Sequence, residues 1–523
     1  MRSHRPHRRL ALAVLLACVR SLLGLRSPLA PRKRPAAGIV AEGEVGAPRP
    51  RVEVGQSWPL GRVAFSLLPL AGSDRRKTIP EEVVPGRVWT FDQIQGVLNV
   101  NVPVRQSVIK LRSGGLWVHN PVAPTAECIR YMKQLEAKHG EVKHIVLGTL
   151  GLEHKATAGP FARLFPDATV WLQPGQWSFP FPIAPWLIGF SPGQLRTLPT
   201  GSSKALSDLV RSGAPEGQKG GARARDVDAL PPWADEISFE VLGPLRFKSV
   251  GAFGESAFLH RASQTLLITD CIIRVDDDPP PIIAEDPRCL LYHARDTIAE
   301  EVRNDAETRR KGWRRIAQFG LSFFPSAIEV RTAETLSDAK RLPPSMAGLD
   351  DGSVPFAVYP WAWERDDVPS FRKLQGGLFV APILQALILN RFPAETREWV
   401  DRVSRLRFKR IIPCHFSNDL KSDAAEFRRA FAFLDAPPDE PPADAGTGVG
   451  AAGGGSKARQ GAQRGAGQRR FFPLKGVRPG APAACDSLNE EFDLLRKASA
   501  ILTRLGIVDP PKAGPLVGQG TKK

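Results

Sequence analysis

The chain has 523 residues and a formal net charge of +18, with 72 Lys and Arg against 54 Asp and Glu. Residues 1–35 hold eight Arg and one Lys without an acidic residue, and residues 453–479 hold seven Lys or Arg, again without one. The rest of the chain carries a net charge of only about +2. The excess of basic residues therefore does not lie on a folded surface, and we predict no nucleic-acid partner.

The N-terminal 40 residues are typical of a targeting segment. A basic start leads into an apolar run at residues 10–19, which is only about half of the roughly twenty residues that a membrane span needs. A secretory signal fits this start, but the continued Arg content and the lack of acidic residues before Glu42 favour an organelle transit peptide. We expect a transit peptide at 1–40, a poorly defined extension at 41–87 and no transmembrane segment.

Two later segments have too little apolar content to pack, because ordering them would cost more entropy than burial could offset. We expect residues 200–232 to be a flexible insertion and residues 436–480 to be a disordered linker rich in Gly, Pro and Ala. The ordered domain is expected over 88–435. Apolar residues recur at helical spacing in 484–507, which predicts a C-terminal helix that docks on this domain.

The ordered domain shows a mixed pattern of strands and helices. The first half predicts strands at 97–104, 107–111, 116–119 and 142–148, with a helix from Thr125 to about Gly140. A Gly-Gly turn joins the second and third strands as a hairpin, and Pro103 places the first strand at a sheet edge. The second half predicts strands at 237–242, 246–250, 256–259, 265–270 and 408–415, and a buried helix in the apolar run 378–389.

Three of these strands end at side chains that can bind a metal. Glu153 and His154 follow the strand 142–148 at the start of a helix, Asp270 ends the strand 265–270, and His415 ends the strand 408–415. Taken singly, each residue is more often structural. Their joint placement at strand ends, where a sheet fixes the backbone and loops leave room for a ligand, predicts a functional site.

The order of these elements, with the corner Thr149-x-Gly151-x-Glu153-His154 and the strand ends at Asp270 and His415, resembles the metallo-β-lactamase fold. More closely, residues 116–122, 177–180 and 408–416 resemble an uncharacterised family of plants, algae and cyanobacteria, whose members carry a domain of unknown function related to that fold. The resemblance implies an α/β protein built as a four-layer αββα sandwich. It also implies that the transit peptide directs the protein to the chloroplast, with the mitochondrion as the alternative.

The fold family implies a site for two metals with the corner motif HxHxDH. Here Thr149 and Gly151 stand where the first two His belong, and residues 250–254 supply no third His, so the first metal site is absent. Glu153, His154, Asp270 and His415 stand at the positions of the second metal.

These four residues leave two interpretations open. In the first, they hold one Zn or Fe ion with a water at an open position, and Glu153 is either a ligand or the general base. In the second, no metal binds: His154 packs at the helix start, Asp270 accepts backbone N–H groups in its turn, and His415 is buried.

Other residues have both a functional and a structural interpretation. His119 follows the strand 116–119 and could contact a substrate as a second catalytic residue, or make a structural hydrogen bond. His260 and Glu255 are interpreted as surface or turn residues. Five cations at 309–315 suggest a phosphate-binding site or, more simply, a solvated helix face. The aromatic run 177–190 packs over the site, contacts a partner or touches a membrane surface.

Two function classes follow. The chain is a metal-dependent hydrolase of a small ester, thioester or phosphorylated metabolite, or it is a non-catalytic binding or assembly protein. Its partner is accordingly a small-molecule substrate or another protein. The six cysteines show no CxxC pair and are typical of reduced intracellular thiols, so they add no metal or redox site.

Overall fold

The protein is described here by a computed structural model, in which the expected segments 1–40 and 436–480, residues 201–229 of the insertion and residues 177–188 of the aromatic run lie outside the described residues. The described residues are 77–97, 100–176, 189–200, 230–249, 251–296, 300–322, 328–330, 361–363, 366–375, 377–435 and 493–513.

The first sheet has seven strands that lie side by side in chain order. Its antiparallel half consists of β1 (Ile79–Val84), β2 (Val88–Val97), β3 (Val100–Lys110) and β4 (Leu116–His119). Its parallel half adds β5 (Val142–Leu147), β6 (Thr169–Leu172) and β7 (Leu195–Thr197). Helix α3 (Ala126–His139) connects β4 to β5, and α4 (Leu152–Arg163) connects β5 to β6.

The second sheet has five strands in the order β14-β13-β10-β9-β8. These are β8 (Ile237–Arg246), β9 (Ala252–His260), β10 (Thr265–Ile268), β13 (Arg410–Pro413) and β14 (Leu420–Lys421). Only the pair β10 and β13 is parallel. A separate two-stranded sheet pairs β11 (Ile328–Val330) with β12 (Trp361–Trp363).

Most of the remaining helices lie between β10 and β13 in the chain, and the last two follow β14. They are α7 (Pro281–Glu285), α8 (Arg288–Ala294), α9 (Ala306–Ser322), α12 (Val368–Arg372), α13 (Pro382–Leu387), α14 (Pro393–Ser404), α15 (Ala424–Arg429) and α16 (Asp493–Arg504), with the short turns η5 (Pro192–Gln194), η7 (Leu389–Arg391) and η8 (Ala432–Asp435). Among the described helices, none combines the length and the apolar character that crossing a membrane requires.

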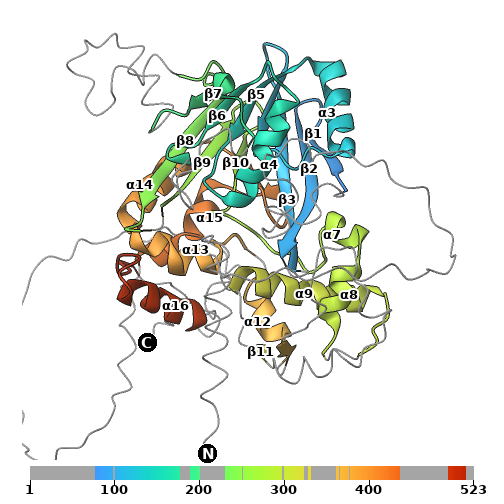
Figure 1. Cartoon of the computed structure of the whole chain (residues 1–523), viewed down its shortest axis with the longest axis vertical. Coiled ribbons are helices and arrows are strands. Elements are labelled where there is room, and N and C mark those ends of the chain that lie inside the picture. The colour runs from blue at the N-terminus through green and yellow to red at the C-terminus, as the bar shows by residue number, and fades with distance from the viewer. Residues whose placement is uncertain are drawn as a thin grey trace, which may run out of the picture.

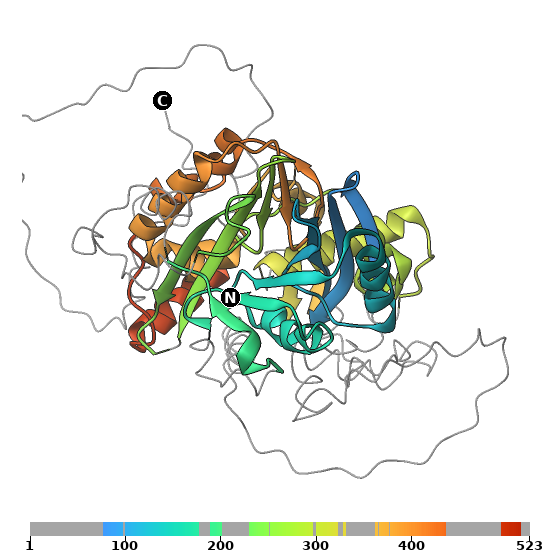
Figure 2. The same cartoon turned by 90° about the horizontal axis from the view of Figure 1, so that it is seen from above.

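The two sheets pack face to face with helices outside both, which confirms the predicted four-layer αββα sandwich (Figures 1 and 2). The first three residues of β4 are apolar because the strand is covered on both faces. Trp117 points into the core between the sheets and contacts Phe258, whereas Leu116 and Val118 point to the outer face with Met132 of α3. A strand covered on both faces needs apolar residues at every position, because successive side chains alternate between the faces.

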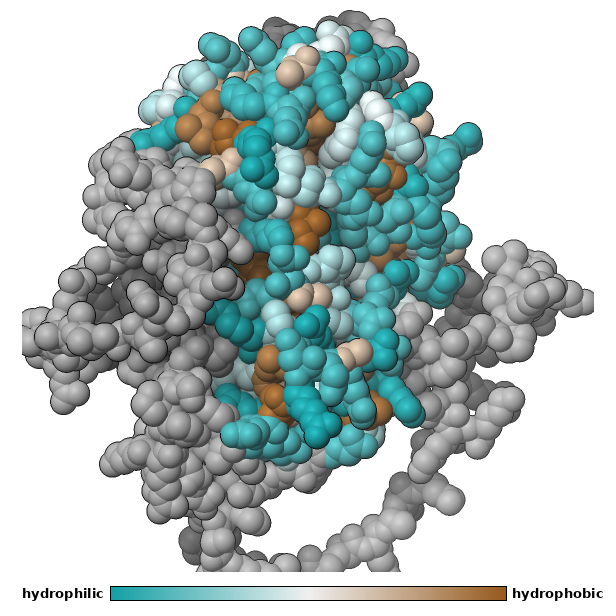
Figure 3. All heavy atoms as spheres, turned by 90° about the vertical axis from the view of Figure 1, so that its right-hand side faces the viewer, coloured by the Kyte–Doolittle hydropathy of each residue, from teal (hydrophilic) through white to brown (hydrophobic). Residues whose placement is uncertain are grey.

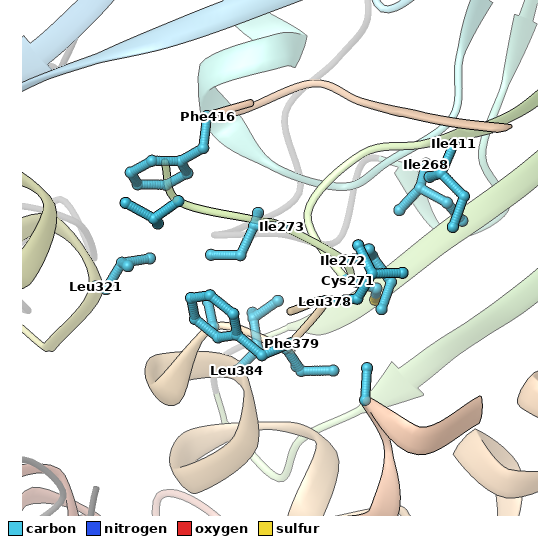
Figure 4. Packing of buried hydrophobic residues seen from close by; sticks show 14 of the residues in the cluster. Ile268, Cys271, Ile272, Ile273, Leu321, Leu378, Phe379, Leu384, Ile411 and Phe416 are labelled. Carbon is cyan, nitrogen blue, oxygen red and sulfur yellow. The ribbon is translucent and has the colours of Figure 1, made fainter. Parts of the chain in front are cut away.

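The outer face of the second sheet packs on the C-terminal helices. Ile268 and Ile411 from neighbouring strands share an apolar core with Leu384 of α13 (Figure 4), and Leu495 of α16 joins the same core. The helix expected within 484–507 is thus observed as α16, and it packs on α13. The face at the right-hand side of Figure 1 is mainly hydrophilic, with apolar residues only in small separate patches (Figure 3).

The structure corrects several boundaries. The first sheet begins with β1, before the expected start at Val88, and the strand expected at 97–104 is divided between the end of β2 and the start of β3. Pro103 does not mark an edge strand, since β3 lies between β2 and β4. However, β4 pairs only with Ser107–Lys110 of β3, so Pro103 has no partner strand on that side. Proline is tolerated there because no ladder hydrogen bond is lost.

Candidate metal centre

The corner between β5 and α4 is built on a glycine. Gly148 follows the last residue of β5, and a Cβ atom there would lie 2.7 Å from the Phe258 ring and 2.9 Å from Nε2 of His119. Only glycine allows this close approach of the backbone. The chain then enters α4 at Leu152, so Glu153 and His154 lie in the first turn of the helix.

Asp270 and His415 are brought together by the parallel pairing of their strands. Ile268 of β10 is in register with Pro413 of β13, and each ligand follows two residues later. Because the carboxyl ends of parallel strands meet at the same edge of a sheet, the two side chains converge. Oδ1 of Asp270 lies 3.1 Å from Nε2 of His415 and 3.7 Å from Nε2 of His154, and the two Nε2 atoms are 3.2 Å apart.

These three distances fit a single metal ion. Three atoms with such separations lie on a circle of radius about 1.9 Å, and zinc bonds to N and O ligands are roughly 2.0–2.2 Å long. An ion just outside the plane of the three atoms would therefore reach all of them. With Glu153, the four ligand atoms lie within 4.8 Å of one another, and Glu153 is the outlying member of the set.

The imidazole of His415 is oriented for ligation. Its Nδ1 donates to the carbonyl of Pro103 at 2.8 Å, which directs Nε2 toward the cluster. The corresponding Nδ1 of His154 is buried and has no hydrogen-bond partner among the described residues, so no such bond orients that ring. Burial by itself would lower the pKa of His415, but the hydrogen bond and charge of Asp270 raise it above the ordinary value.

Negative charge accumulates at this site. Burial would raise the pKa of Asp270, but its hydrogen bonds to His154 and His415 lower the pKa below the usual range and keep the carboxyl ionised. In the described ranges no Lys or Arg forms an ion pair with Glu153, Asp270 or Glu255. A divalent cation would balance this charge, and the mixed nitrogen and oxygen donor set suits Zn²⁺ or Fe²⁺.

One expectation of the metal-free interpretation is wrong. The Asp270 carboxylate accepts no backbone N–H group from the described part of the chain; its other oxygen, Oδ2, lies 3.5 Å from Oγ1 of Thr149. Glu255 accepts those backbone groups instead, from Thr269 at 2.8 Å, Asp270 at 2.9 Å and Cys271 at 3.0 Å. The turn of Asp270 is therefore held by a neighbouring strand, and the Asp270 side chain is free to face the imidazoles.

Sequence reasoning missed this role of Glu255, and the interpretation of Glu255 and His260 as surface or turn residues is wrong. Both lie within the continuous strand β9 and are buried. His260 lies at the opposite end of β9 from the candidate centre and bonds to Ser263 at 2.7 Å. Little in the sequence indicated this, because Gly254 and Glu255 interrupt the strand-forming residues between Ala252 and His260.

Arg105 of the first sheet and Asn120, which follows β4, also hold the loops of the candidate centre in place. Arg105 of β3 donates to the carbonyls of Pro413 at 2.7 Å and Phe416 at 3.1 Å, on either side of His415. Asp92 of β2 in turn binds the Arg105 guanidinium through two bonds of 2.7 Å. The loop that carries His415 is thus clamped by an ion pair from the other sheet, and no local pattern in the sequence indicates such a contact.

Asn120 is the second of these supports. Its Oδ1 accepts the N–H of Gly148 at 2.9 Å, and its Nδ2 donates to Thr269 at 2.8 Å and to the sulfur of Cys414 at 3.4 Å. The three partners follow the three strands that carry the ligands.

His119 lies close to the site but does not belong to the ligand cluster. Its ring is fully buried between Trp117 and Phe258, and neither nitrogen has a hydrogen-bond partner among the described residues. Burial, followed by repulsion from His154, lowers the pKa of His119 to about 3. The imidazole is therefore neutral, and the structure shows neither an exposed position for substrate contact nor the expected structural hydrogen bond.

The cations expected at 309–315 lie on α9 and are tied to acidic or amide side chains. Arg309 bonds to Asn304, Arg310 to Asp278, Lys311 to Asp296, Arg314 to Asp367, and Arg315 to both Asp296 and Asp367. Each cation already has a partner, so the helix offers no free cluster for a phosphate group.

Solved structures similar to this chain include a metallo-β-lactamase from Pontibacter korlensis, with 8% identity, a TM-score of 0.28, and coverage of 69% of this chain and 99% of that one. The flavodiiron core of Flv1 from Synechocystis sp. PCC6803 has 8% identity and a TM-score of 0.31 over 69% of this chain and 60% of its own. The flavodiiron protein from Giardia intestinalis has 11% identity and a TM-score of 0.31 over 69% and 59%. This chain thus spans about three fifths of the flavodiiron proteins that it matches.

No curated protein matches the sequence. A protein family, by contrast, matches residues 85–433, which is more than half of the chain and includes every residue of the candidate centre. The predicted resemblance to an uncharacterised family is thereby confirmed, and the chain belongs to the family described as "Domain of unknown function (DUF4336)".

Proposed function

We propose that the protein is a mononuclear metal-dependent hydrolase of a small ester, thioester or phosphorylated metabolite. The observation that carries the proposal is the convergence of His154, Asp270 and His415, which follow three different strands and whose ligand atoms lie 3.1–3.7 Å apart. These residues would hold one Zn²⁺ or Fe²⁺. Such an ion supplies a Lewis acid and lowers the pKa of a bound water toward neutrality.

We propose Glu153 as the proton acceptor beside this centre. Two ligands of one ion with bonds of about 2.1 Å can be at most about 4.2 Å apart, whereas the cluster that includes Glu153 extends to 4.8 Å. The Glu153 carboxylate is thus better placed to take a proton from a water molecule than to be a fourth tight ligand.

Metal content tests the proposal directly. The purified protein should carry about one Zn or Fe per chain by elemental analysis, and His154→Ala, Asp270→Ala and His415→Ala should each abolish it while the circular dichroism spectrum is kept. His260→Ala is the matched control, since it removes another buried histidine at the far end of β9 and should leave the metal in place. A folded wild-type protein that takes up no metal contradicts the proposal and favours the non-catalytic binding or assembly protein.

The role of Glu153 is tested by activity. Glu153→Gln should retain the metal but lose about 10²–10⁴-fold in kcat toward a small ester, thioester or phosphate ester, as expected for the loss of a general base. Loss of the metal in this variant would instead assign Glu153 as a ligand.

We also propose that the protein resides in the chloroplast. The Arg-rich N-terminal 40 residues, which lack acidic residues, support an organelle transit peptide. The choice of the chloroplast rests on the family resemblance.

A further inference from the structure

We propose that Glu255 is the positioning residue of this centre: it fixes the backbone at Asp270 so that Oδ1 faces His154 and His415, and thereby sets the metal affinity. The inference rests on the proposed function in one respect, because an effect on affinity requires that a metal binds. Its geometric part stands independently, on the three hydrogen bonds that Glu255 accepts.

The contacts of Glu255 are specific to the loop of Asp270. Strand β10 ends at Ile268, and the next three backbone N–H groups all point at one carboxylate: Oε1 accepts Thr269 at 2.8 Å, and Oε2 accepts Asp270 at 2.9 Å and Cys271 at 3.0 Å. Hydrogen bonds to a charged group are stronger than those between neutral groups. Three of them on consecutive residues fix the direction in which the Asp270 side chain leaves the backbone.

Only a carboxylate can accept these three bonds in the space of one side chain. A Gln amide presents one oxygen and one NH₂ group, and the NH₂ group would face either one or two N–H donors. The charge nevertheless has a cost, because Glu255 is fully buried and lies near the Asp270 carboxylate. Burial, followed by repulsion from Asp270, raises the pKa of Glu255 to about 7, while the backbone hydrogen bonds lower it.

In the metal-free protein, a second carboxylate beside Asp270 is unfavourable, because the two groups repel each other. At a metal centre the same charge is useful, because it increases the negative potential that attracts a divalent cation. Glu255 therefore acts on the metal in two ways, through the orientation of Asp270 and through its field.

The test compares Glu255→Gln with a matched control. Glu236 is also buried, and its carboxylate accepts the N–H of Arg112 at 3.0 and 3.1 Å, at the other end of the same sheet. We expect Glu255→Gln to weaken Zn²⁺ binding at least tenfold in a chelator competition and to change the visible absorption of the Co²⁺-loaded protein. Glu236→Gln should lower the melting temperature without either effect. Wild-type affinity and an unchanged Co²⁺ spectrum in Glu255→Gln would overturn the proposal.

Glu255→Asp covers the case in which the Gln variant does not fold. It keeps the charge but is one methylene shorter, so it should fold and still bind Zn²⁺ more weakly than the wild type. Equal affinity would count against the positioning role.

Hydrogen exchange separates this proposal from the proposed function. In the metal-free proteins, Glu255→Gln should accelerate amide exchange over residues 269–271, whereas Glu236→Gln should not. If the wild type binds neither Zn²⁺ nor Co²⁺, the hydrolase proposal fails and the exchange result alone decides the role of Glu255. Unchanged exchange at 269–271 would refute it.

Discussion

Replacing Asn120 by Ala should destabilise the protein more than most single substitutions do. The change leaves the buried N–H of Gly148 without an acceptor, which costs about 1–3 kcal/mol, and removes the bond to Thr269, which contributes about 1 kcal/mol. Asn120 also has a left-handed backbone with φ of 46°, where Ala is disfavoured by about 1 kcal/mol or more. The sum is a loss of about 3–5 kcal/mol in the free energy of unfolding.

Urea unfolding of the metal-free protein measures this loss, and Asn120→Gly divides it into its parts. The Gly variant lacks the same hydrogen bonds but adopts a positive φ without strain. We therefore expect Asn120→Ala to be less stable than Asn120→Gly by about 1 kcal/mol. Within strands and helices the order is usually the opposite, with the Gly variant the less stable one. A loss below about 1 kcal/mol in the Ala variant, or a Gly variant less stable than the Ala variant, would refute the reasoning.

Three further predictions concern metal binding and targeting. Burial lowers the pKa of His415, but Asp270 raises it above the ordinary 6.5. Protons should therefore begin to displace Zn²⁺ above pH 6.5. A Zn²⁺ affinity that stays constant from about pH 8 to pH 6 in a chelator competition would contradict this. The Lys side chain in Arg105→Lys cannot form both hydrogen bonds to Asp92, so this variant should bind Zn²⁺ roughly tenfold more weakly, as measured by calorimetry. Wild-type affinity would show that the contact of Arg105 does not position His415. Residues 1–40 fused to a fluorescent protein should direct it into chloroplasts, and a cytosolic or mitochondrial signal by microscopy would oppose the proposal.

Strands and helices could be predicted because burial leaves a clear pattern in the sequence, whereas their arrangement in four layers was implied by the family resemblance. Apolar runs such as Leu116-Trp117-Val118 indicate strands covered on both faces, and Pro382 correctly placed the start of α13. Strand boundaries were less accessible, because they depend on pairing partners. β1 contains Pro80, Glu81 and Glu82 and has little apolar signal of its own, and only its pairing with β2 makes it a strand.

The residues of the candidate centre could be predicted, whereas the residues that hold them in place could not. Glu153, His154, Asp270 and His415 lie at strand ends in the order of a recognisable motif, and the structure brings them together. The supports act across large separations in the chain, as in the contact of Arg105 with the loop of His415. A sequence shows which side chains can ionise, but it does not show which distant backbone groups they meet.

The distribution of charge favours a bound metal over a metal-free remnant of the fold. Asp270 and Glu255 are neighbouring acids in a buried site, and the described residues provide imidazoles but neither Lys nor Arg as ion-pair partners. Hydrogen bonds offset part of the cost of burying these carboxylates, but removing a charge from water still costs several kcal/mol, and replacing such groups by well-packed apolar residues is often neutral or stabilising. In a metal-free fold the two acids would therefore lower the stability of the protein. With one divalent ion on His154, Asp270 and His415, the same two charges become the source of the binding energy.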